Sequence, residues 1–386
     1  MNSNKKFCAL PWINLSIDVN GSLRPCCRYL QPNVQTEYKL PFIHQGNKDL
    51  AEHYNSDQWK KLRRAFINGE QPHECSLCWN DEQGGIKSYR ETFVESKQID
   101  TSKVNFTMDT VSSPLVLDLK LNNVCNLKCR ICGPQASSTY AKEYKLLWNK
   151  ELPELEYWTH DKITNTQHEQ VISDWANNLQ HIEMTGGEPM TSPENVKILQ
   201  LIATKSSLSD KTMLINTNVT HWNQQLINYL TQFKKATICL SVDDLYERQE
   251  YHRYPSKWDI IEKNVDKFID LRNNYPNIEV ILFCTISNFN VFYIPEYDQW
   301  AKNKNLFVHY NILHTNEKYC IRNLPMIVKV QVKEKLLDFA NITSFMMLSE
   351  QNDHYQKFID EIEILDNYRN QDFMSTFPKW SEVLGL

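Results

Sequence analysis

The chain has 386 residues, of which 42 are basic, 47 are acidic, 11 are cysteine and only 9 are glycine. The net charge of −5 gives no electrostatic reason to expect nucleic-acid binding. Neither GxGxxG nor GxxxxGK[ST] occurs, so the sequence gives no support to a dinucleotide-binding turn or a phosphate-binding loop. The apolar runs are strand-sized and the first residues lack the apolar segment of a secretory signal, so we expect a cytoplasmic protein that does not enter a membrane.

The cysteines are unevenly placed, because eight of the 11 lie within the first 132 residues. In the cytoplasm such cysteines are more typical of metal ligands or catalytic thiols than of disulfides. Pattern changes along the chain predict three regions, which are residues 1–110, 111–316 and 317–386. In the first region, Ser56 is a good N-cap for a helix that runs to Asn68, and Gly69 then ends it in a left-handed conformation.

The middle region alternates between strand-like and helix-like segments. Leucines at 115, 117, 119 and 121 recur with period two, which predicts a first strand. Further strands are predicted near 180–185, 211–217, 236–242, 278–285 and 306–312, and helices near 137–149, 192–204, 223–233, 257–273 and 293–304. This alternation predicts an α/β fold, a partial (β/α)6 barrel whose chemistry lies at the C-terminal ends of its strands. The last region is expected to be helical, with one helix over 353–369.

A cysteine motif directly follows the first predicted strand. Cys125, Cys129 and Cys132 form CxxxCxxC in VCNLKCRICG. Three thiolates on one short loop can bind three corners of an iron–sulfur cluster and leave one iron open. Structural zinc is the alternative, although zinc usually takes four protein ligands and no fourth is near in sequence.

This motif and its placement resemble the radical SAM enzymes, and the similarity extends from Pro114 to about Thr315. The resemblance implies that Cys125, Cys129 and Cys132 hold a [4Fe–4S] cluster. It also implies that one polar or glycine-rich motif at each strand end binds S-adenosylmethionine. The residues matching the family's cosubstrate motifs are Ile131, Gly186, Gly187, Glu188, Asn218, Ser241, Asp243 and Arg253.

Each match implies its own contact. Ile131 is expected on the adenine, Gly186-Gly187-Glu188 on the amino group, and Arg253 on the carboxylate of the cosubstrate. Ser241 and Asp243, in the S-x-D pattern, are expected to hydrogen-bond ribose and carboxylate groups. Asn218 belongs to a TNG-like motif, in which Val219 replaces the usual glycine and puts a close backbone approach in doubt.

A second cysteine set lies in the first region. FCALPW, GSLRPCCRY and HECSLCW can together close a four-thiolate site, which suits either zinc or an iron–sulfur cluster. These segments resemble the twitch form of the SPASM domain, although here the domain precedes the barrel. The resemblance implies one auxiliary [4Fe–4S] cluster, for which we assign Cys8, Cys26, Cys75 and Cys78, with Cys27 as an alternative to Cys26.

The other cysteines have weaker signals. Cys239 and Cys284 lie inside predicted strands and are expected to be small buried apolar residues. Cys320 follows the sixth strand, where a hydrogen-donor role is an alternative to a structural one. His314, at the end of that strand, is a candidate ribose or substrate contact, with a structural hydrogen bond as its alternative.

The resemblance implies an enzyme of oxidoreductase or maturase type that reductively cleaves S-adenosylmethionine to a 5′-deoxyadenosyl radical, which abstracts a hydrogen atom from a substrate. The auxiliary cluster would accept an electron or anchor the substrate, and a flavodoxin- or ferredoxin-like protein would supply electrons. A peptide substrate is preferred, with oxidation or epimerisation of a sugar or aminoglycoside as the alternative. A non-enzymatic electron carrier or structural zinc protein is the alternative of another class.

Overall fold

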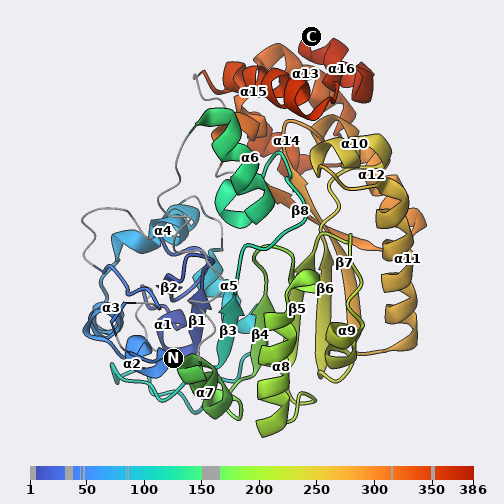
Figure 1. Cartoon of the computed structure of the whole chain (residues 1–386). Coiled ribbons are helices and arrows are strands. Elements are labelled where there is room, and N and C mark those ends of the chain that lie inside the picture. The colour runs from blue at the N-terminus through green and yellow to red at the C-terminus, as the bar shows by residue number, and fades with distance from the viewer. Residues whose placement is uncertain are drawn as a thin grey trace. The chain divides into compact units, whose positions relative to one another are not determined.

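The structure is a computed structural model, and it describes residues 6–30, 38–43, 45–46, 48–83, 85, 87–149, 166–313, 316–348 and 353–386. Its strands form one sheet in the order β2-β1-β3-β4-β5-β6-β7-β8 (Figure 1). The strands are β1 (Asn14–Ile17), β2 (Leu23–Arg24), β3 (Val116–Leu119), β4 (His181–Met184), β5 (Thr212–Thr217), β6 (Lys235–Leu240), β7 (Ile278–Ile286) and β8 (Phe307–Ile312).

The six predicted strands are β3 to β8, and they follow one another across the sheet in sequence order. The pairs β3–β4, β4–β5 and β7–β8 are parallel. Helices lie between successive strands along the chain, and the residues after β8 are largely helical. The predicted α/β class with its run of six strands and helical C-terminal extension is therefore confirmed.

Two strands of the N-terminal region extend this sheet, which the sequence did not predict. β1 pairs in parallel with β3, so that Asn14 lies opposite Val116, and β2 pairs antiparallel with β1. All four residues of β1 are buried, although its sequence NLSI alternates polar and apolar residues. An alternation over only four residues lies at the lower limit of length from which a strand can be predicted.

The chain forms two compact units. The first comprises Met1–Cys125, Pro134–Ile215 and Asn223–Thr237, and the second comprises Asn126–Gly133, Asn216–Trp222 and Ile238–Leu386. Helices of the first unit are α1 (Leu10–Ile13), α2 (Leu50–Tyr54), α3 (Asp57–Ile67), α4 (Ser76–Gln83), α5 (Tyr89–Ser96), α6 (Ser138–Trp148), α7 (Thr166–Trp175), α8 (Pro193–Lys205) and α9 (Gln224–Leu230). Helices of the second are α10 (Tyr246–His252), α11 (Trp258–Asn274), α12 (Ile294–Asn303), α13 (Met326–Lys335), α14 (Ala340–Met346), α15 (His354–Arg369), α16 (Phe373–Thr376) and α17 (Pro378–Leu384).

Helix α3 tests the two local signals that predicted it, an N-cap at Ser56 and a left-handed glycine at its end. It begins after Ser56 and is followed by Gly69, whose φ of +77° is the predicted left-handed conformation. The Ser56 hydroxyl makes no capping hydrogen bond, however, and is buried without a partner in the described part of the chain. Burial of Trp59 and Phe66 on one face of the helix, rather than the cap, therefore holds α3 in place.

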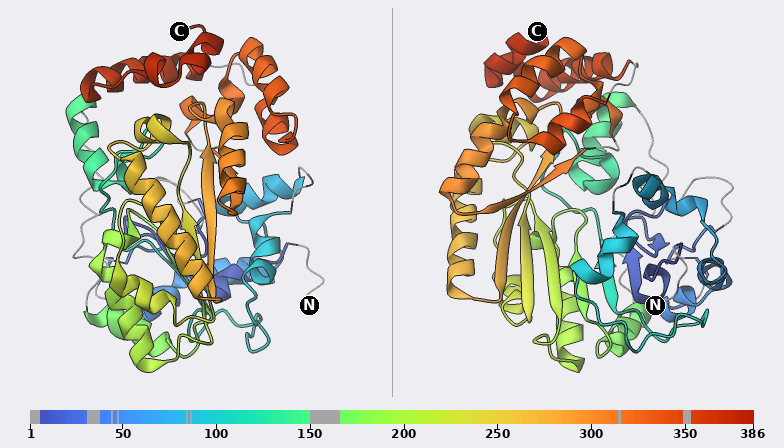
Figure 2. Two further views of the ribbon diagram at one scale, coloured as in Figure 1. Left: turned by 90° about the vertical axis from the view of Figure 1, so that its right-hand side faces the viewer. Right: turned by 180° about the vertical axis from the view of Figure 1, so that it is seen from behind.

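In the second unit, β7 alternates strictly between buried and half-buried residues, although its sequence IEVILFCTI is a nearly continuous apolar run. The C-terminal helices gather beyond the ends of β7 and β8 (Figures 1 and 2). Trp380 of α17 fixes them there, because its indole N–H donates to the Asn288 carbonyl (2.7 Å) just after β7. No helix in the described residues is long and apolar enough to cross a membrane.

Candidate functional site

The four cysteines assigned to the N-terminal site line a single pocket. Cys8, Cys26, Cys75 and Cys78 come from three separate segments, and all four border the same space together with apolar residues such as Leu10 and Phe66. The side chains of Arg28 and Arg90 complete the lining. Soft donors converging on one small, mostly apolar space are what an iron–sulfur cluster requires. Within the described ranges, no three His, Cys, Asp or Glu side chains are grouped closely enough to hold a single metal ion.

Burial dominates the electrostatics of this pocket. It raises the pKa of the Cys8 thiol to about 12, and the nearby Cys78 raises it further, whereas Arg90 opposes the rise. Burial likewise raises the pKa of Cys26 well above its ordinary value, with Cys27, Cys8 and Cys75 adding to the effect. The thiols of Cys8 and Cys26 are therefore held in the protonated form, and a bound metal must displace these protons.

Cys27 lies in a different environment from its neighbour Cys26. It is exposed and does not line the pocket. Although Cys27 is exposed, desolvation of its sulfur by the surrounding atoms raises the pKa of the thiol, the Asp118 carboxylate raises it further, and Lys120 lowers it. Cys27 in turn raises the pKa of Cys26, so the two thiols are electrostatic neighbours and differ in whether they line the pocket.

The turn after β4 is packed directly against the segment that leads into the CxxxCxxC loop. Gly187 donates its backbone N–H to the Asn122 carbonyl (3.1 Å), and Glu188 donates to the Val124 carbonyl (2.8 Å). A Cβ on Gly187 would lie 2.2 Å from the Val124 oxygen, and one on Gly186 would lie 2.9 Å from the Asn122 oxygen. The two glycines thus permit a close approach of backbone to backbone, which no larger residue allows.

Glu188 is buried at the end of this turn. One of its carboxylate oxygens accepts the backbone N–H of Met190 (2.9 Å) and so caps the short 3-10 turn that follows. Gly186, Gly187 and Glu188 therefore stand together at the C-terminal end of β4, as the sequence predicted, with Glu188 already held by its own loop.

The cysteine loop of the second unit is tied to the end of α10 by two backbone hydrogen bonds. Lys128 donates to the Tyr254 carbonyl (2.6 Å), and Arg130 donates to the His252 carbonyl (2.9 Å). Arg253 lies between these two acceptors. The loop bearing Cys129 and Cys132 is therefore held beside Arg253, although the two segments are more than 100 residues apart in sequence.

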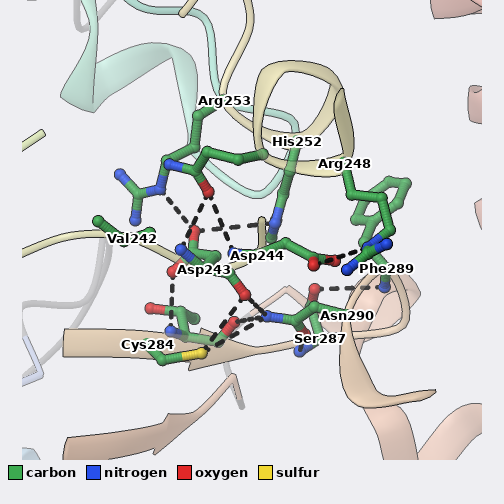
Figure 3. Close-up of polar contacts among 12 residues, drawn as sticks. Val242, Asp243, Asp244, Arg248, His252, Arg253, Cys284, Ser287, Phe289 and Asn290 are labelled. Atoms are coloured by element: carbon green, nitrogen blue, oxygen red, sulfur yellow. Dashed lines mark hydrogen bonds and ion pairs between the residues drawn. The ribbon is translucent and has the colours of Figure 1, made fainter. Parts of the chain in front are cut away.

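Arg253 is oriented by Asp243 (Figure 3). The Arg253 Nε donates to the Asp243 Oδ2 at 2.6 Å, and Asp243 Oδ1 accepts the backbone N–H of Thr285 at 2.8 Å. Burial alone would raise the pKa of Asp243, but Arg253 and then His252 hold it below its ordinary value. Burial opposes the charge of Arg253, yet Asp243 raises the pKa of the guanidinium, with Cys129 and Cys132 adding to the rise.

The two terminal nitrogens of Arg253 have no hydrogen-bond partner among the described residues, and neither nitrogen is fully buried. A planar pair of N–H donors is the group that binds a carboxylate bidentately.

Burial raises the pKa of the Cys129 thiol, whereas Arg253 and Arg369 lower it. Two arginines from outside the CxxxCxxC segment thus add positive charge beside Cys129, in addition to Lys128 and Arg130 within the segment.

Asn218 joins the same loop from the end of β5. Its Nδ2 donates to the Asn126 Oδ1 (3.0 Å), and Asn126 donates to the Thr220 hydroxyl (3.0 Å). Val219 has a left-handed backbone, with a φ of +66° and no exposed surface. A β-branched residue is strained at positive φ. The position at which the TNG-like motif has glycine therefore has a backbone conformation that glycine adopts without this strain.

The remaining predicted residues have simpler surroundings. Ile131 and Ser241 are half-buried, and the Ser241 backbone N–H donates to the Thr217 carbonyl (2.8 Å). Cys239 and Cys284 are buried inside β6 and β7, as expected. Cys320 has no exposed surface. His314 lies outside the described residues.

Sequence reasoning missed four residues that shape this region, which are Gln249, Asn126, Arg130 and Asp366. Gln249 accepts the backbone N–H groups of both Asp243 (3.0 Å) and Asp244 (3.1 Å). Asn290 donates to the Asp243 carbonyl (2.8 Å), so several hydrogen bonds hold this strand end (Figure 3). Arg130 and Asp366 pair across 236 positions of sequence. Asn126 and Arg130 could have been noticed, since they lie within the cysteine motif, whereas Gln249 and Asp366 carry no local signal.

Solved structures of similar proteins include native anSMEcpe with bound AdoMet and Cp18Cys peptide. It is 17% identical, with a TM-score of 0.37, over 51% of this chain and 50% of that one. Streptococcus suis SuiB bound to S-adenosylmethionine is 13% identical, with a TM-score of 0.39, over 75% of this chain and 60% of that one. This chain therefore spans half to three fifths of the length of these structures.

A curated relative is GTP 3′,8-cyclase from Aquifex aeolicus (strain VF5), which is 28% identical over 111 residues. The match covers 28% of this chain and 30% of the relative. Residues 119–287 match the family model of the radical SAM superfamily, and residues 8–79 match that of SPASM, an iron–sulfur cluster-binding domain. The chain thus carries a radical SAM domain over residues 119–287, and its SPASM domain, over residues 8–79, precedes it.

Proposed function

We propose that this protein is an enzyme in which Cys125, Cys129 and Cys132 hold a catalytic [4Fe–4S] cluster and Cys8, Cys26, Cys75 and Cys78 hold an auxiliary one. The convergence of the last four on one pocket supports the second assignment, and the exposed position of Cys27 outside it favours Cys26 as the ligand. Three ligands on one loop leave one iron open, which supports the first assignment.

The observation that carries the enzyme assignment is the orientation of Arg253. Its guanidinium is fixed by Asp243, lies beside the cysteine loop and keeps two terminal donors unused by the described residues. A carrier of electrons needs no such group, whereas a cosubstrate with a carboxylate does. When bound, the cluster with S-adenosylmethionine would supply an organic radical able to remove a hydrogen atom from an unreactive carbon.

The chain's own residues would bind and orient this cosubstrate. Arg253 would hold its carboxylate, and Glu188 with Gly186 and Gly187 its amino group. Asn218 and Ser241 are placed at the ends of β5 and β6 for the ribose hydroxyls, and Ile131 for the adenine. In this scheme Asp243 acts mainly by orienting Arg253, because both of its carboxylate oxygens are already engaged.

For the substrate, we propose a peptide, on the resemblance of the N-terminal region to SPASM domains. A sugar or aminoglycoside is the second candidate. The two can be separated by binding measurements, since a maturase should bind a short peptide encoded beside its gene and a sugar enzyme should not. A flavodoxin- or ferredoxin-like donor is proposed as the source of electrons.

The test is anaerobic reconstitution with iron and sulfide, followed by reduction in the presence of S-adenosylmethionine. We expect about eight irons per chain, from two clusters of about four each, and production of 5′-deoxyadenosine. The combined substitution Cys125→Ala, Cys129→Ala and Cys132→Ala should abolish the product and keep about four irons. Absence of 5′-deoxyadenosine from the reconstituted protein would leave the electron-carrier alternative, and loss of all iron from the triple variant would contradict the two-site assignment.

A further inference from the structure

The side chain of Arg130 connects the cysteine loop to the C-terminal extension. Arg130 lies between Cys129 and Cys132 and has no exposed surface. Its Nη2 contacts the Asp366 carboxylate of α15 and donates to Gln371 Oε1 (3.0 Å). The guanidinium carbon also lies 3.7 Å from the centre of the Tyr251 ring. These contacts join the loop to residues more than 230 positions away in sequence.

Asp366 is itself held firmly. Its Oδ1 also accepts the Tyr251 hydroxyl (2.7 Å), and its Oδ2 accepts the backbone N–H of Phe373 (2.7 Å), the first residue of α16. Gln371 donates its backbone N–H to the Asp366 carbonyl (3.0 Å), beyond Asn370, whose φ of +51° ends α15. The turn between α15 and α16 thus presents two fixed acceptors, Asp366 and Gln371, to Arg130.

The charge on Arg130 makes this contact a requirement. Its Nε and Nη1 are buried and have no hydrogen-bond partner in the described part of the chain, so Asp366 and Gln371 supply the polar contacts of the guanidinium that the structure describes. A buried charge that loses its partner is strongly unfavourable. Without Asp366, Arg130 must leave this position, and the backbone of its neighbours Cys129 and Cys132 must move with it.

We propose that Asp366, supported by Gln371, is a positioning residue that fixes the conformation of the cysteine loop through Arg130. The C-terminal extension then completes the cluster-binding loop in addition to covering the strand ends. This role rests on the proposed function in one respect, namely that Cys129 and Cys132 are cluster ligands. Partners that orient metal ligands typically contribute about 10–100-fold to metal affinity or activity when they are removed.

Metal-free protein provides the decisive readout, because it tests the loop whether or not the proposed function holds. The rate at which an alkylating reagent labels Cys129, which is 8% exposed, is measured by mass spectrometry in wild type and Asp366→Asn. We expect labelling to be at least about tenfold faster in the variant, with the labelling of Cys8 unchanged. Gln371→Ala, which keeps the ion pair and loses one hydrogen bond, should give a smaller increase, and it serves as the test if Asp366→Asn does not fold.

Glu361→Gln is the matched control, since Glu361 lies on the same helix, pairs with Lys318 and accepts the Tyr319 hydroxyl (2.6 Å) without contacting the loop. We expect it to lower the unfolding midpoint without changing the labelling of Cys129. Equal labelling in wild type and Asp366→Asn, or an equal increase in Glu361→Gln, would overturn the proposal.

Reconstituted protein gives a second readout, the rate at which a chelator removes iron. Asp366→Asn should lose about four irons at least about tenfold faster than wild type, while the other four are released at the wild-type rate. Unchanged release would count against the positioning role. A wild type that binds no iron would instead refute the proposed function, and the alkylation result would still decide the inference.

Discussion

The two cysteine sites of this chain are built in opposite ways. The N-terminal pocket gathers four thiols from three segments, and burial raises the pKa values of Cys8 and Cys26 among them. The CxxxCxxC loop carries its three thiols on eight consecutive residues, and other parts of the chain hold it, through the carbonyls at the end of α10 and through the contacts of Asp366 and Gln371 with the loop's own Arg130. On the proposed assignment, a metal would join three distant segments in the first site, whereas in the second the fold holds the loop that carries the ligands. Five experiments bear on this difference.

The largest difference is expected in stability. Cys75→Ala with Cys78→Ala should remove about four irons and lower the unfolding midpoint of the reconstituted protein by roughly 10 °C or more, because segments far apart in sequence lose their common ligand. Cys129→Ala with Cys132→Ala should also remove about four irons but lower the midpoint by only a few degrees. Iron assays and anaerobic thermal unfolding followed by circular dichroism give both values, and equal midpoints in the two variants would contradict the comparison.

A second experiment tests how tightly the chain packs beside the loop. In Gly187→Ala the new Cβ meets backbone at 2.2 Å, and a backbone carbonyl cannot move aside as a side chain can. We expect a loss of about 3 kcal/mol in the free energy of unfolding. Gly46→Ala is the control, because its φ of +73° strains any added Cβ whereas nothing lies within 4 Å of that Cβ, and it should cost only about 1 kcal/mol. Comparable losses in urea denaturation would show that the close packing is unimportant.

A third experiment concerns the charges beside the loop. Asp243→Asn removes the carboxylate that orients Arg253 and should weaken S-adenosylmethionine binding by about 10–100-fold while leaving the iron content unchanged. Glu82→Gln, which breaks the corresponding pair with Arg90 at the N-terminal pocket, should leave this affinity as it is. Titration of the reconstituted proteins with the cosubstrate measures both, and equal weakening would argue against a specific role of Asp243.

The pH dependence of wild-type binding follows from the same pair. The pKa of Asp243 is held below its ordinary value, so its carboxylate is fully charged at every pH above the ordinary pKa range of an aspartate. The stabilisation that this charge gives is lost only as the pH falls through the lowered pKa that Asp243 has in the folded protein. Affinity should therefore stay level from about pH 8 down to about pH 5. A decline that begins at the upper end of this range would mean that another group controls binding.

The smallest effect is expected at Cys27. Because it is exposed and lies outside the pocket, Cys27→Ala should change the free energy of unfolding by no more than about 0.5 kcal/mol and leave the iron content intact. Cys26→Ala, one residue away, should lose about four irons. Loss of iron from Cys27→Ala but not from Cys26→Ala would instead assign Cys27 as the ligand.

The sequence was informative wherever a signal is local or periodic. The six strands from β3 to β8 were placed within a few residues, because leucine alternation and buried β-branched runs are visible without knowledge of the partners. The glycines after β4 and the arginine after β6 were identified by motif, and the structure places Gly187 and Arg253 against or beside the cysteine segment.

Contacts between distant segments could not be predicted in this way. From the sequence alone, Arg130 would be taken for an ordinary surface arginine. Nothing in the sequence around Arg130 or around Asp366 predicts that the two residues form a pair. The conformation of Val219 was also invisible, since a valine normally excludes positive φ and only the surrounding hydrogen bonds, such as that from Asn264 to its carbonyl (2.7 Å), hold it there. The orientation of Cys27 away from the pocket required the fold as well.

The pairing of β1 with β3 has a consequence for how this protein is made. Asn14 leaves the ribosome about a hundred residues before Val116, its neighbour in the sheet, and synthesis at about 5–20 residues per second makes that interval several seconds long. During this time the edge of β1 has no strand to pair with on that side. Conversely, a barrel expressed without its N-terminal region would expose the matching edge of β3 permanently. An unpaired edge of this kind invites association between chains, so the pairing of β1 with β3 protects the edges of both strands.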